Sequence, residues 1–237
     1  MAVGKRAGNM HTGHEPISLP FNTKISSLFT ALALTIFLTF TLGMFCFGEN
    51  FLFWQHAFSD LGSTITPCGN SNLLSLSIFV MGMLISAVLM ILIACHFSRD
   101  ESLNHRQLKY YLSLLAALGF IVITYPHNLN NQIHSYGAAT MVGSLWAFGV
   151  LLLVELKPLI FGPRYNLYQA LLQGTVLTYA FTYFINAPIK QVTQKFAVVG
   201  LVATLKLATS QSVLRYIKKA IPRYREALAQ KESIHTV

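Results

Sequence analysis

The polar side chains that could do chemistry gather in two short stretches of an otherwise apolar chain. One stretch runs from His56 to Ser63, and the other runs from His127 to His134. Imidazoles beside a carboxylate can bind a metal ion or transfer protons. If the two stretches meet, they form one candidate site. Its residues are His56, Ser59, Asp60, Ser63, His127, Asn128 and His134.

Three roles fit this set of residues. In the first, Asp60, His127 and His134 hold Zn²⁺, whose bound water attacks a lipid ester or amide, as in a hydrolase or acyltransferase. In the second, the same groups hydrogen-bond a lipid headgroup without breaking a bond. In the third, they only satisfy one another and the loop backbone. The sequence has no tightly spaced metal motif and no Gly-rich phosphate loop, so no soluble cofactor is predicted.

The local pattern suggests how these residues are held. Asp60 has the appearance of a turn or cap residue that accepts backbone N–H groups, and it shares a face with His56 if that stretch is helical. Asn and Pro between the two later histidines indicate a loop. His127 is then expected to close one helix, and His134 to open the next, with Ser135 as its cap.

The elements that must position these stretches are long apolar runs. Of the 237 residues, 54% are hydrophobic and only 11% are charged, whereas soluble domains carry about 25% charged residues. The sequence predicts an all-α integral membrane bundle of six transmembrane helices, with a polar segment at 1–24 and a basic tail at 217–237. The expected spans cover residues 25–47, 73–97, 108–126, 135–160, 167–187 and 192–216.

The net charge of +9 is distributed in a way that predicts orientation. Most Lys and Arg residues fall in the two ends of the chain and in the second and fourth gaps between runs. The positive-inside bias therefore puts both termini in the cytoplasm and the His-containing loops outside or in a lumen, in a bacterial plasma membrane or a eukaryotic endomembrane. Nucleic acid is not an expected partner. The basic tail either contacts anionic inner-leaflet lipid or acts as an ordinary topology signal.

Two further features leave alternatives open. Lys206 lies inside the last run, where it either reaches the inner headgroups or contacts a substrate anion. Cys46 and Cys68 fall on the outer side, where they either form a disulfide or remain separate, with Cys46 a small buried residue.

Several of these residues carry a family resemblance. The stretch Phe58-Ser59-Asp60-Leu61-Gly62, Pro126-His127, and His134 followed by Gly137-Ala138 resemble the damage-regulated autophagy modulator and FGF-receptor-activating protein (DRAM/Frag) family. Related bacterial membrane proteins of unknown function share the Ser-Asp-Leu-Gly pattern. A weaker similarity links the Ser, Asp and His placement to ceramidases and adiponectin receptors.

The DRAM/Frag resemblance implies six transmembrane helices with cytoplasmic termini and a role in membrane-lipid organisation, remodelling or autophagy control. Asp60, His127 and His134 are the site positions that it carries over. Members often have a carboxylate in the last helix, where this chain has Lys206. The leading hypothesis is a membrane protein that engages lipid headgroups at its outer face. A metal-dependent lipid enzyme and a scaffold for partner membrane proteins are the alternatives.

Overall fold

A computed structural model describes residues 19–160 and 162–219, which form helices and loops with no β-strand. The predicted termini at 1–18 and 220–237 lie outside the described residues. The all-α prediction is confirmed. The helices are α1 (Thr23–Phe45), η1 (Phe58–Gly62), α2 (Leu73–Arg99), α3 (Arg106–Val122), α4 (Asn131–Leu156), α5 (Pro163–Gln169), η2 (Ala170–Gly174), α6 (Thr175–Phe184) and α7 (Lys190–Ala208).

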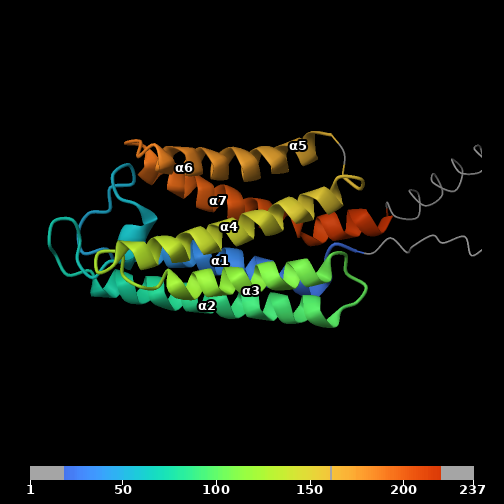
Figure 1. Cartoon of the computed structure of the whole chain (residues 1–237), viewed down its shortest axis with the longest axis horizontal. Helices are drawn as coiled ribbons and strands as arrows, with labels where there is room; N and C mark the ends of the chain where they lie inside the picture. Colours follow the sequence, from blue (N-terminus) through green and yellow to red (C-terminus); the bar gives the residue numbers. More distant parts are fainter. Residues whose placement is uncertain (1–18, 161, 220–237) are drawn as a thin grey trace, which may run out of the picture.

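Within the described ranges, the long helices run along one axis of the molecule (Figure 1). Helices α1 to α4 pack in sequence order, each against the next. Helix α5, the π-helical turn η2 and α6 follow as one rod, and α7 returns against α1 and α4. The segment that leads into α1 and the segment that follows α7 lie at the same end of the bundle (Figure 1). The opposite end carries the loops before α2 and α4, and we call it the loop end.

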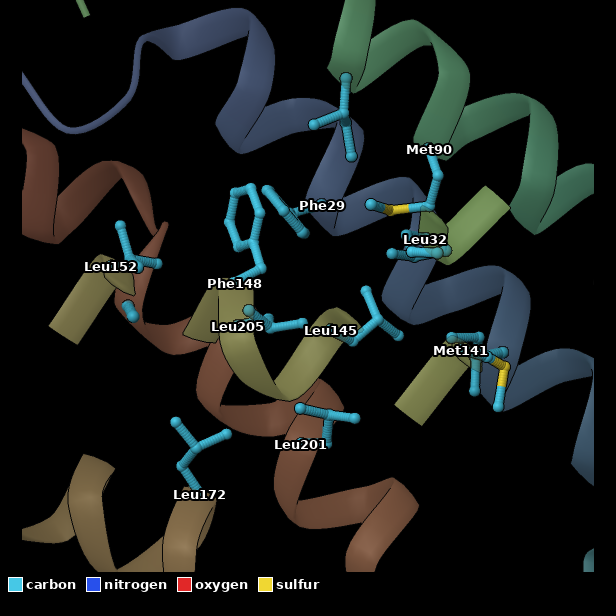
Figure 2. Close-up of a cluster of buried hydrophobic side chains, with 14 of the residues drawn as sticks. Phe29, Leu32, Met90, Met141, Leu145, Phe148, Leu152, Leu172, Leu201 and Leu205 are labelled. Atoms are coloured by element: carbon cyan, nitrogen blue, oxygen red, sulfur yellow. The ribbon is translucent and has the colours of Figure 1, made fainter. Parts of the chain in front are cut away.

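The packed core lies where α1, α2, α4 and α7 meet. Figure 2 shows Phe29 and Leu32 of α1 close to Met90 of α2, with Phe148 of α4 beside Phe29. The rings of Phe29 and Phe148 are 5.3 Å apart between centroids. Leu205 of α7 contributes to the same cluster, and all five side chains are buried. Because their hydrophobic area is packed inside the bundle, these four helices have fixed positions relative to one another.

The outward faces of the helices are also apolar. Exposed side chains include Phe37 on α1, Val88 on α2, Leu115 on α3 and Phe181 on α6. Three described helices are long and apolar enough to cross a membrane, namely α1, α2 and α4. A fourth span is added if α7 and the helix Gln211–Lys219, bent by 41°, count as one. These features suit an integral membrane protein, because a soluble surface does not expose so much apolar area.

The helix boundaries correct two local predictions. Helix α3 ends at Val122 rather than at 126. A turn at Ile123 and Thr124 follows, and Tyr125, which directly precedes Pro126, is disfavoured in the helical conformation. Helix α4 begins at Asn131 instead of His134, and its cap is Asn130, whose side chain accepts the N–H groups of Gln132 and Ile133. The prediction of Ser135 as the cap was therefore wrong.

Candidate functional site

The two polar stretches meet at the loop end. The hydroxyl of Ser63 lies 2.6 Å from Nδ1 of His127. One residue further along each stretch, the Asn128 amide oxygen accepts the Thr64 N–H at 3.0 Å, and its NH₂ donates to the Thr64 hydroxyl at 2.7 Å. These contacts join segments 64 residues apart in the chain, so the predicted meeting of the two stretches is confirmed.

Asp60 and His127 face each other across this junction. One carboxylate oxygen of Asp60, Oδ2, accepts the N–H of Ala57 at 2.7 Å, which confirms the predicted backbone role. The other, Oδ1, lies 3.6 Å from Nε2 of His127. Since Ser63 contacts the opposite ring nitrogen, the His127 ring is held between a hydroxyl and a carboxylate.

His134 joins the same group from the first turn of α4. Its Nδ1 donates to the backbone carbonyl of Tyr125 at 2.9 Å. The centroid of its ring is 5.7 Å from that of His127 and 6.4 Å from that of Phe79. Because Nδ1 is used by the carbonyl, the tautomer and the orientation of this ring are set by the turn that precedes α4.

His56 lies apart from this group. Its ring packs against Phe47 and Phe51, and its Nε2 is 3.5 Å from a carboxylate oxygen of Glu49. Hydrogen bonds from Cys68 and Thr66 lower the pKa of the Glu49 carboxyl. The condition for a shared face of His56 and Asp60, a helix through both residues, is not met, because the backbone is extended at Ala57 and the 3₁₀ helix begins only at Phe58.

A cavity of about 1000 Å³ opens beside Asp60, His127 and His134. Ser59 also lines it, whereas Ser63, Asn128 and His56 are absent from its wall. Further polar side chains at this end are Gln55, Asn131, Asn186, Lys190, Gln191 and Gln194. The cavity therefore has a polar mouth at the loop end.

The wall of the cavity changes from polar to apolar along two helices. On α4, the lining passes from Asn131 and His134 through small residues to Val142. On α7, it passes from Lys190 and Gln194 to Val198. Helices α4 and α7 thus place polar groups at the loop end and apolar groups deeper in the bundle, whereas α6 lines the cavity with tyrosines and apolar side chains along its length.

The cavity is bordered by a link between α4 and η2 and by exposed residues of α6. The indole of Trp146, which lines the cavity, donates to the Gln173 amide oxygen at 3.0 Å and so ties α4 to η2. On α6, Leu177 and Phe184 line the cavity but remain 52% and 86% exposed. The opening thus lies along α6, on a side of the bundle with exposed apolar side chains.

Three residues that sequence reasoning did not single out hold the wall of the mouth. Gln194 accepts the Phe58 N–H at 3.0 Å, and Lys195 donates to the His56 carbonyl from a position 4.8 Å from the Phe53 ring centroid. Asn72 donates to the carbonyls of Asp60 and Ser63. These side chains fix η1, and with it Asp60. The only sequence signal for these contacts is the aromatic-rich loop that contains Phe58. That signal does not identify Gln194 or Lys195, which lie more than 130 residues further along the chain.

Metal and disulfide chemistry receive little geometric support. Among residues 19–160 and 162–219, no three His, Cys, Asp or Glu side chains are placed to hold a metal ion. All three cysteines are free, so the alternative of a Cys46–Cys68 bridge is not realised. Lys206 donates to the hydroxyl of Thr30 at 2.7 Å, a contact within the bundle that neither alternative for this residue included.

Comparisons with known proteins add no relative. The chain matches no protein-family model, no curated protein and no solved structure.

Proposed function

We propose that this protein binds a membrane lipid in the cavity, with the headgroup at Asp60, His127 and His134. An acyl chain would extend along the apolar wall. The observation that carries the proposal is the common gradient from polar to apolar on α4 and α7. A ligand with one polar and one long apolar end satisfies such a wall, whereas a small polar metabolite would leave the apolar part uncovered.

The proposal includes a membrane orientation. The bundle crosses six times, with α3 and the α5–α6 rod spanning beside α1, α2, α4 and α7. The loop end then faces outside or a lumen, and both termini are cytoplasmic. An even number of crossings is supported by the segments before α1 and after α7, which lie at the same end of the bundle. A side opening along α6 would let a lipid move in directly from the surrounding leaflet.

Lipid binding accounts for the site better than catalysis does. The Ser63, His127 and Asp60 contacts contain the groups of a hydrolase, but Ser63 is 2% exposed and does not line the cavity. A nucleophile must reach its substrate. Stoichiometric zinc in purified protein would favour the metal-dependent alternative. A scaffold role requires no lipid in the cavity, and the DRAM/Frag resemblance stays a prediction.

Leucine at Gly143 is expected to displace the lipid. A Cβ atom at Gly143 meets no atom within 4 Å, and the residue lines the cavity. The larger side chain can therefore occupy the acyl-chain path without a clash in the core. We expect lipid retained per protein, measured by mass spectrometry of purified samples, to fall about ten-fold, as expected for roughly 1.4 kcal/mol of lost binding.

Gly143→Ala is the matched control, because it adds only one carbon to the same open position. It should retain lipid as the natural protein does, and both variants should unfold at a similar temperature. Equal lipid retention by Gly143→Leu and Gly143→Ala would show that the cavity does not hold the lipid.

A further inference from the structure

The cavity mouth contains one acid and one lysine. Among the described residues that line it, Asp60 is the only acidic side chain and Lys190 the only lysine or arginine. Oδ2 of Asp60 is engaged by the Ala57 N–H, but the nearest ring nitrogen to Oδ1, on His127, is 3.6 Å away. That separation is too long for a hydrogen bond. Asp60 lines the cavity, so Oδ1 retains capacity to accept a hydrogen bond from a ligand there.

The two charged groups lie on different walls of the mouth. Asp60 lies on η1, which Gln194 of α7 holds through the Phe58 N–H at 3.0 Å. Lys190 lies four residues before Gln194, in the first turn of α7, and its side chain donates to the amide oxygen of Asn186. The mouth therefore presents a negative group on η1 and a positive group on the first turn of α7.

We infer that the lipid headgroup is zwitterionic and carries a primary ammonium next to a phosphodiester, as phosphoethanolamine does. This inference rests on the proposed lipid-binding function. The ammonium donates to Oδ1 of Asp60, and the phosphate oxygens face Lys190. Both contacts are charge-assisted hydrogen bonds, which are the stronger kind. An anionic headgroup without an amine would instead bring negative charge to Asp60.

The proposed donor distinguishes ethanolamine from choline. A primary ammonium has three N–H groups that a carboxylate oxygen can accept, whereas a trimethylammonium has none. Choline binding sites rely on aromatic rings around the cation. Because the wall also contains aromatic rings, among them Phe58 and Tyr179, comparing ethanolamine with choline tests whether the carboxylate or the rings set the preference.

The test measures competition for the cavity among lipids with identical acyl chains. Purified full-length protein in detergent is given phosphatidylethanolamine, phosphatidylcholine or phosphatidylglycerol, and bound lipid is measured by native mass spectrometry. We expect phosphatidylethanolamine to bind about ten-fold more tightly than either of the others, the size of one charge-assisted hydrogen bond. Equal binding of phosphatidylcholine or phosphatidylglycerol would overturn the inference.

Asp60→Asn removes the charge but keeps an oxygen for the Ala57 N–H. It should abolish the preference for phosphatidylethanolamine and leave phosphatidylglycerol binding unchanged or tighter. An unchanged preference in a folded variant would overturn the inference. The comparison of headgroups on the natural protein needs no variant, so it decides the matter even if Asp60→Asn does not fold. If the natural protein shows no headgroup preference but Gly143→Leu still lowers bound lipid, only the headgroup assignment is refuted. If Gly143→Leu does not lower bound lipid, lipid binding in the cavity is itself refuted.

Discussion

Replacing Glu155 with leucine is expected to lower the free energy of unfolding by about 3 to 5 kcal/mol, because a buried lysine would lose its partner. Nζ of Lys109 lies 2.5 Å from one carboxylate oxygen of Glu155, and their side chains are 0% and 2% exposed. His105 contacts the other carboxylate oxygen at 2.7 Å. The loss can be measured by unfolding the protein in mixed detergent micelles.

An exposed pair in the same region provides the control. Arg106 lies 3.3 Å from Glu101, whose side chain is 84% exposed. Glu101→Leu should change stability by less than about 1 kcal/mol, since water already solvates both charges. The double variant Lys109→Met with Glu155→Leu should regain most of the loss, because no unpaired charge remains buried. Equal effects of Glu155→Leu and Glu101→Leu would contradict this account of the buried pair.

Alanine at Gly137 is expected to destabilise the protein by about 1 to 3 kcal/mol through overpacking. Its Cβ would lie 2.4 Å from the backbone nitrogen of Ile123. A Cβ at Gly119 would likewise lie 2.4 Å from the Met141 nitrogen. Helices α3 and α4 therefore approach backbone to backbone, as small residues allow in membrane bundles. Thermal unfolding in detergent measures the effect.

The proposed lipid site should respond to the same substitution. His127 follows α3 and His134 lies in the first turn of α4, so a forced separation of these helices moves the two rings apart. Gly137→Ala should then retain less lipid, whereas Gly143→Ala, on the same helix but facing open space, should be neutral in both assays. A stable Gly137→Ala variant would show that this crossing can relax without cost.

The helices were predictable from the sequence because each apolar run is long and uninterrupted. The run at 73–97 agrees closely with α2, Leu73–Arg99. The start of α4 was not predictable to the residue, since Asn128, Asn130 and Ser135 are all acceptable caps. Asn128 does not cap the helix, because its side-chain oxygen accepts the N–H of Thr64 from another loop. Six membrane spans remain a prediction beyond the three or four helices that are long and apolar enough.

The site was predictable only in part, for a similar reason. Asp60, His127 and His134 stand out because polar groups are rare in this chain, and the structure brings them together. His56 stands out equally, yet the fold directs its ring to Glu49. The cavity itself arises where α6 diverges from α4, which is a matter of tertiary packing that local patterns do not contain. Lys109 and Glu155 were missed because they become partners only when α3 and α4 pack.

The most direct test of the central claim is photo-crosslinking with two forms of one lipid, one with a diazirine at the end of an acyl chain and one with it in the headgroup. Labelled residues are mapped by mass spectrometry. The account predicts that the acyl-chain probe labels deep positions such as Val142 and Val176, and that the headgroup probe labels the mouth near Asn131. Labelling confined to outward-facing residues such as Leu115, or the reverse order along the cavity, would contradict it.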